Sequence, residues 1–256
     1  MKKIIYGIIT ALLSCIIIIC FMLFFKTIYH KKQSINDTPL INNENKVENM
    51  HSEFYNPNVS VDDIILYFNE IAFGAEYIND GNPYKLQKWN EAIYYIIIGD
   101  YTSEDLVTLS TFIDWLNTIE GFPGIYETKD LTKANLKINF CTQDTLVSIM
   151  GSNFEKTDGA VTFWYENDII YDAVIYYRTD LNQHLRNSVI IEEIYNGLGF
   201  INDTNLRTDS IIYSEFSEPQ ELTEIDKILL KILYNKELKN GMNADECEQV
   251  IRTLYY

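Results

Sequence analysis

Four residues in the second half of the chain carry side chains that could do chemistry together. Glu192 and Asn196 are four residues apart, so a helix places them on one face. Glu193 lies between them, and Asp203 follows in the next loop. Carboxyl groups in such a set can bind a hard cation or act as acid and base. We therefore take Glu193 as the candidate catalytic residue, and Glu192, Asn196 and Asp203 as candidate binding residues.

The segment that carries these residues is predicted to be a helix over residues 185–199. Its apolar residues form one stripe, and Gly199 has the structural role of ending the helix. His184 stands at the start of the helix as a further candidate binding residue. Adjacent helix residues point about 100° apart, so Glu192 and Glu193 are poorly placed to share one ion.

The spacing of these residues resembles that of a zinc protease. Glu192, Glu193 and Asn196 occupy the positions of the H-E-x-x-H motif, in which two histidines bind zinc and the glutamate activates water. Gly199 and Asn202 stand at the glycine and the third histidine of the longer form. The layout is similar to a degenerate metzincin-type (zincin) fold that lacks its zinc-binding histidines. This resemblance implies a zincin-like mixed sheet, an active-site-type helix and no metal.

The wider pattern resembles an uncharacterised family, the domain of unknown function numbered 2927. The matching segments are residues 67–77, 88–93, 192–203 and 222–243. They span most of the predicted domain. The family resemblance implies a domain type and a site, but no reaction.

The elements that must position the site follow from hydrophobic periodicity. Apolar spacing and caps predict helices over 60–77 and 102–121, and short apolar or alternating runs predict strands over 91–100, 134–141 and, as a pair, 159–180. After residue 180 the pattern is helical, apart from a loop over about 200–221. The predicted fold is therefore α+β, a mixed sheet with packed helices and a helical C-terminal part, in one domain over 60–256.

The N-terminus predicts attachment to a membrane. Residues 4–25 are 22 residues without a charge, long enough to cross a hydrocarbon core of roughly 30 Å. Residues 1–3 form a short tail before this transmembrane helix or signal anchor, and residues 26–59 read as a flexible stalk. We expect a single-pass protein of the cell membrane with its globular domain on the extracytoplasmic side.

Charge and cysteine content limit the partners. Residues 33–256 carry 15 basic and 37 acidic side chains, which excludes nucleic acid as a partner. Cys141 and Cys247 are the cysteines outside the predicted anchor. Their positions in the sequence leave a disulfide and two free thiols equally open.

Two main functions remain open. The first is a catalytically inactive, metalloprotease-like binding or scaffold domain with a protein or peptide ligand in its cleft and no cofactor. The alternative is a hydrolase, a peptidase or glycosidase, that uses a carboxylate site or a hard cation, Ca²⁺ or Mg²⁺, at Glu192, Glu193 and Asp203. Neighbouring tyrosines, Tyr94–Tyr95 and Tyr176–Tyr177, leave an aromatic carbohydrate platform as a third reading.

Overall fold

The computed structural model describes residues 52–74, 84–215 and 219–256, which belong to one compact unit over residues 50–256. The predicted transmembrane helix over 4–25 and most of the predicted stalk lie outside the described residues. Within the described ranges, none of the helices combines the length and apolar character needed to span a membrane.

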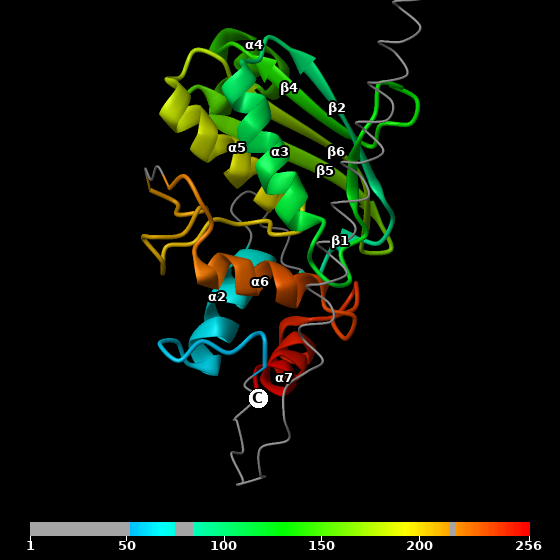
Figure 1. The fold of residues 1–256 in the computed structure, drawn as a ribbon, viewed down its shortest axis with the longest axis vertical. Helices are drawn as coiled ribbons and strands as arrows, with labels where there is room; N and C mark the ends of the chain where they lie inside the picture. Colours follow the sequence, from blue (N-terminus) through cyan, green and yellow to red (C-terminus); the bar gives the residue numbers. More distant parts are fainter. Residues whose placement is uncertain (1–51, 75–83, 216–218) are drawn as a thin grey trace, which may run out of the picture. The chain divides into compact units, whose positions relative to one another are not determined.

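A six-stranded, mostly parallel sheet forms one layer of the domain (Figure 1). The strands are β1 Lys88–Trp89, β2 Ile93–Gly99, β3 Ile125–Glu127, β4 Leu136–Cys141, β5 Gly159–Glu166 and β6 Ile169–Arg178. They follow the order β1-β6-β4-β2-β3 with parallel neighbours, and β5 pairs antiparallel with β6. β5 is therefore the strand that runs against the others.

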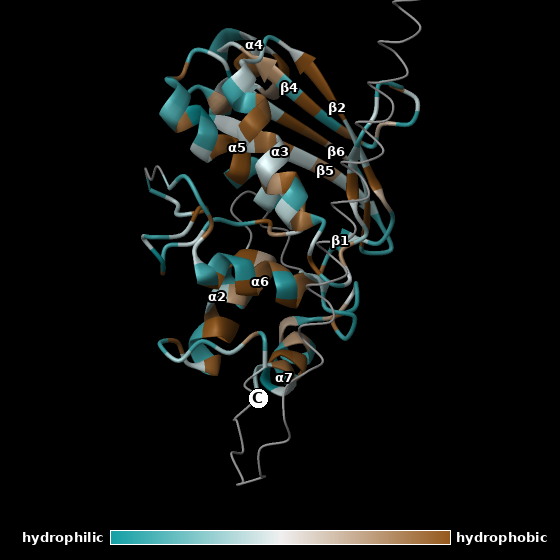
Figure 2. Cartoon of the chain, viewed as in Figure 1, coloured by the Kyte–Doolittle hydropathy of each residue, from teal (hydrophilic) through white to brown (hydrophobic). Residues whose placement is uncertain are grey.

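The strands bury one face of this sheet. Alternate residues of β4 are buried, and those of β6 in register with them, such as Ile175 beside Ile138, are buried too. Figure 2 shows hydrophobic residues along β2, β4 and β6. Helices α3 Ser103–Leu116 and α5 Gln183–Gly197 lie against the sheet in Figure 1, and α5 contacts β5 and β6.

The remaining helices are α2 Val61–Phe73, α4 Gln143–Met150, α6 Glu224–Tyr234 and α7 Ala244–Tyr255, with a short 3₁₀ helix η1 at Ser152–Phe154. Helix α2 contacts α6 and α7. Side-chain hydrogen bonds join this group to the end of α5. Tyr195 donates to the Asp226 carbonyl at 3.0 Å, and Tyr234 donates to the Leu198 carbonyl at 2.8 Å. The C-terminal half of α5 is thereby fixed between the sheet and the lower helices.

The predicted element types agree with this architecture. The structure confirms a mixed sheet with packed helices, and it shows the sheet to be mostly parallel. It contains β2–α3–β3 and β4–α4–β5 successions, and the named elements after β6 are the helices α5, α6 and α7, which confirms the predicted helical C-terminal part. The two short strands β1 and β3 were not predicted, because two or three residues show no periodicity. Helix α3 ends at Leu116 and not near Gly121, since the Asn117 side chain bonds the backbone of Ile125.

The boundary of the predicted stalk needs a correction. Residues 52–59 belong to the domain, because Phe54 is only 6% exposed and packs into the core. The Tyr255 hydroxyl in α7 donates to the Asn56 carbonyl at 2.9 Å, and Ser52 Oγ donates to the Tyr255 carbonyl at 3.0 Å.

Cys141 and Cys247 are free thiols in the structure and do not form a disulfide.

Candidate functional site

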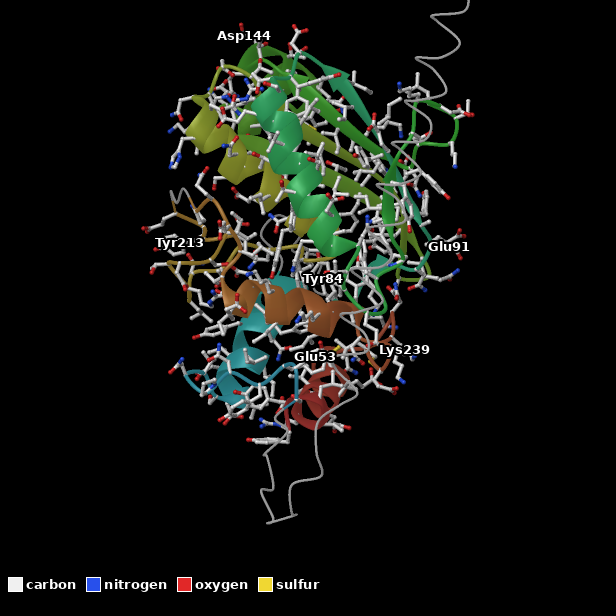
Figure 3. All side chains as sticks on the ribbon, viewed as in Figure 1. Glu53, Tyr84, Glu91, Asp144, Tyr213 and Lys239 are labelled. Carbon is white, nitrogen blue, oxygen red and sulfur yellow. The ribbon has the colours of Figure 1, made fainter. Side chains whose placement is uncertain are left out.

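A cleft of about 690 Å³ lies between β5, α5 and the loop that follows α5. Residues 158–163 form one wall, and Val189, Glu192, Glu193 and Asn196 of α5 face it. The loop contributes residues 200–203, 211 and 213–215, and Tyr84 and Gln87 are among the other lining residues. Figure 3 shows Tyr84 and Tyr213 among the labelled side chains. Three segments distant in the sequence therefore build one site.

Close packing of α5 against β5 sets the position of Glu193. A Cβ atom at Gly159 would stand 2.6 Å from Glu193 Oε1 and 2.7 Å from Val189 Cγ1. At such distances the Glu193 and Val189 side chains, or α5 itself, would have to move. Gly159 is therefore needed for the Glu193 side chain, only 7% exposed, to lie over the start of β5.

The cleft is strongly acidic. Its carboxyl groups belong to Asp158, Glu192, Glu193, Asp203 and Glu215, against one lysine, Lys156. Burial raises the pKa of Glu192 well above its usual range, and the neighbouring charges of Asp203 and Asp158 raise this pKa further. The Glu192 carboxyl group therefore gains a proton far more readily than an exposed glutamate does.

Asn196 connects the helix to the loop. Its Nδ2 donates to Asp203 Oδ1 at 3.2 Å. Its Oδ1 is buried and has no hydrogen-bond partner among the described residues. A buried acceptor without a donor costs free energy, so a ligand that supplies an N–H or O–H group would find a ready partner here.

Glu70 of α2 holds the loop that carries Asp203. Its carboxylate accepts from the Asn205 backbone at 2.9 Å and from the Thr204 hydroxyl. The Asn202 amide donates to the carbonyl of Asp203 at 2.8 Å and to that of Glu70 at 3.2 Å. The loop is thus fixed by α2, more than 130 residues away in the sequence.

The outer edge of β5 borders the cleft with open backbone groups. Arg178 N donates to the Asp158 carbonyl at 3.3 Å, which makes this opposed pair a hydrogen-bonded one. Bonded and non-bonded pairs alternate along an antiparallel ladder. The N–H and C=O groups of Gly159, Val161 and Phe163 therefore point away from β6, toward the cleft side of the strand.

The donor set of the cleft does not suit zinc. Among the described residues, its polar lining offers carboxylate, amide, hydroxyl and ammonium groups but no imidazole or thiol, the ligands that zinc sites in proteins use most. Oxygen donors fit Ca²⁺ or Mg²⁺ better. Within the described part of the chain, no three His, Cys, Asp or Glu side chains are grouped closely enough to hold a metal ion.

The structure brings together four of the residues singled out in the sequence. Glu192, Glu193, Asn196 and Asp203 all line the cleft, whereas His184 is an exposed residue in the first turn of α5 that does not line it. Gly199 lies just beyond α5 with φ of 129°, and a Cβ there would meet the Gln87 carbonyl at 2.3 Å. Only glycine fits this position.

Sequence reasoning missed the strand side of the cleft. Gly159 is the first residue of the strand pair predicted over 159–180 and Asp158 precedes it, and nothing in their spacing relates them to Glu193. The paired tyrosines do not contribute, since neither Tyr94–Tyr95 nor Tyr176–Tyr177 lines the cleft. Tyr177 is buried in the core, where its hydroxyl donates to the Ile190 carbonyl at 3.0 Å.

Comparison with known proteins gives a family without a function. The family model described as "Protein of unknown function (DUF2927)" matches residues 62–253, which include most of α2 and α7 and every described element between them. No curated protein matches the chain.

Proposed function

The chain belongs to the DUF2927 family of proteins of unknown function, and we propose that its domain binds an extended peptide segment by strand addition to β5. The observation that carries this proposal is the free outer edge of β5 beside an acidic cleft. A peptide would exchange backbone hydrogen bonds with Val161 and Phe163. Main-chain bonding of this kind provides affinity without requiring a particular sequence.

The cleft chemistry sets the preference for the bound segment. Alternate side chains of an added strand point to the α5 side of the sheet, where Glu192, Asn196 and Asp203 lie. A lysine or arginine at such a position would meet carboxylate charge, and its N–H groups would supply the donor that Asn196 Oδ1 lacks. We therefore propose a segment with a basic residue as the ligand.

We further infer that the site is a non-catalytic relative of a zinc-protease site. Glu192 and Asn196, which replace the two histidines of H-E-x-x-H, both face the cleft. A carboxylate and an amide at these positions, with no imidazole or thiolate beside them, make a poor zinc site. The Lewis acid and the metal-activated water of such proteases are thereby lost. Of the features of a zinc-protease site, this site would keep the cleft that holds a polypeptide.

Binding can be tested with labelled peptides by fluorescence polarisation on the soluble domain. We expect extended peptides with a central lysine or arginine to bind at low micromolar concentration or weaker, and acidic variants of the same peptides not to bind. Val161→Pro removes an outward N–H without removing a bond to β6, and proline is tolerated on an edge strand. Val161→Ala, which keeps the N–H, is the matched control.

The proposal requires Val161→Pro to weaken binding at least tenfold while Val161→Ala changes it little. Equal affinities of the two variants would rule out strand addition. Circular dichroism of both variants checks that each remains folded, so that loss of binding is not loss of structure.

A second candidate function is carboxylate-based hydrolysis. The observation that favours it is the raised pKa of Glu192 beside Asp203, since a carboxyl group with a raised pKa keeps its proton to higher pH and can act as a general acid. Glu193 or Asp203 would act as the base, with or without Ca²⁺ or Mg²⁺. Peptidase and glycosidase substrates test this candidate, which requires turnover that Glu192→Gln abolishes. Its metal version requires bound metal that the same variant loses.

We propose that residues 4–25 anchor the domain in the cell membrane with residues 52–256 on the extracytoplasmic side. The uncharged length of the N-terminal segment supports this placement. Protease added to intact cells should degrade a C-terminal tag if the proposal is correct, and should spare it if the domain is inside.

A further inference from the structure

A second cavity, of about 500 Å³, lies beside β1. Gln87 lines the acidic cleft, and its neighbour Lys88 lines the second cavity. The other walls come from the loop before β3, the turn between β5 and β6, and the segment after α6. In Figure 3, Lys239 and Tyr213 lie on opposite sides of the view, so the two cavities open in different places.

The charges that line this cavity are all positive. They belong to Lys88, Lys236 and Lys239, and the other polar lining side chains are uncharged. Asp168 follows the lining residue Asn167, but its carboxylate lies beside Gly241, outside the lining. Three lysines without a lining carboxylate are unexpected in a domain where acidic residues outnumber basic ones by more than two to one.

Lys88 is a built part of this cavity, with only 6% of its surface exposed. Its ammonium donates to the Leu233 carbonyl at 2.6 Å and to the Leu238 carbonyl at 2.8 Å, near the end of α6. An ammonium has three protons to donate, so these two bonds leave one. The two bonds that fix the end of α6 therefore use only two of the three N–H groups of the Lys88 ammonium.

The ammonium groups of Lys88 and Lys239 repel each other. Burial of Lys88, which is the larger cause, and the charge of Lys239 together lower the pKa of Lys88 to about 8. Lys88 thus remains mostly protonated at pH 7, at a cost that no lining anion offsets. A bound oxyanion would offset it and would also accept hydrogen bonds from the Asn90 and Asn167 amides.

We propose that this basic pocket binds an oxyanion, with a phosphate group as the simplest ligand. The buried Lys88 would supply a fixed charge at the base of the pocket, and Lys236 and Lys239 would close over the ligand from the rim. Phosphate suits the pocket because it accepts several hydrogen bonds and attracts ammonium groups strongly. The site is separate from the acidic cleft and does not depend on peptide binding there.

Isothermal titration of the soluble domain with inorganic phosphate, at constant ionic strength, tests this site. We expect saturable binding to the wild-type domain, and at least tenfold weaker binding to Lys236→Gln/Lys239→Gln. The double variant Lys129→Gln/Lys133→Gln removes the same charge from an exposed loop and is the matched control. Phosphate should also raise the melting temperature of the wild-type and control proteins but not of the pocket variant.

Absence of saturable phosphate binding to the wild-type domain would overturn the proposal, and so would equal binding to both double variants. Two further ligands identify the source of the phosphate. Binding of soluble glycerol phosphate without co-sedimentation on phosphatidylglycerol vesicles assigns the pocket to a soluble ligand. Co-sedimentation that the pocket variant loses assigns it to a lipid headgroup.

Discussion

The two ends of α5 differ in whether a nearby carboxylate is paired with a cation. At the N-terminal end, the fully buried Asp105 of α3 pairs with Arg186, which is 7% exposed, and Gln183 donates to the same carboxylate at 2.7 Å. At the C-terminal end, Glu192 faces a cavity together with Asp203, and no described cation pairs with Glu192.

The difference distinguishes a carboxylate that is neutralised within the fold from one that faces the cleft without a described counter-ion. Asp105 has its counter-ion inside the fold, so its charge is satisfied whether or not a ligand is present. The charge of Glu192 is opposed by its neighbours, and only a proton or an external cation can relieve it. The buried pair of Arg207 with Asp226, 2.7 Å apart, follows the pattern of Asp105. The predictions below test this contrast along one helix.

Asp105→Ala should have the largest effect on stability. The substitution leaves the Arg186 guanidinium buried without its anion and removes the capping-box bond from Thr102 N to the Asp105 carboxylate, so the free energy of unfolding should fall by about 3–5 kcal/mol. Urea denaturation measures this loss. Replacing Arg186 by Met in the same protein should recover part of it, and no recovery would show that the cap, not the ion pair, dominates.

Gly159→Ala should disturb the cleft by an intermediate amount. The added Cβ would overlap Glu193 and Val189, so we expect a loss of about 1–3 kcal/mol and weaker peptide binding. Denaturation and fluorescence polarisation measure the two effects. Glu193→Ala in the same protein removes one of the clashing side chains and should restore part of the stability. A Gly159→Ala protein as stable as the wild type would contradict the tight approach of α5 to β5.

Glu192→Gln should stabilise the domain at pH 7 by about 1 kcal/mol, the scale of an ordinary substitution. The folded state raises the pKa of Glu192, so it binds a proton more tightly than the unfolded chain. The wild-type domain therefore loses stability as pH rises from about 4.3 through the raised pKa, and the amide removes this loss.

The same comparison has an internal control. At pH 4 the carboxyl group is largely protonated in both states, so the advantage of Glu192→Gln should nearly vanish. Glu166→Gln, at the exposed end of β5, should change stability little at either pH. A constant difference between pH 4 and pH 8 would show that the Glu192 carboxyl is not held in its neutral form.

His184→Ala should have the smallest effect. The side chain is exposed in the first turn of α5 and does not line the cleft, so stability should change by no more than about 0.5 kcal/mol and peptide affinity should not change. A tenfold loss of peptide affinity would show that His184 belongs to the binding site. The two ends of α5 would then not differ in the way described above.

Local patterns in the sequence predicted most elements but not their arrangement. Ser60 and Asp63 form the expected capping box of α2, and the turn at Asn167 and Asp168 separates two strands as expected. Both features depend on atoms a few residues apart. The parallel pairing of β2 with β4 and the addition of β1 to β6 depend on contacts between distant segments, which periodicity does not encode.

For the site, the sequence by itself determined that Glu192 and Asn196 share one helix face and that Gly199 follows the helix, because helical spacing and backbone sterics are local. Only the tertiary structure decided that Asp203, held by Glu70, meets Asn196, and that the start of β5 at Gly159 lies against Glu193. The physical reason is packing. Because Gly159 has no side chain, α5 packs closely against β5. The chemistry of the cleft depends on this close packing.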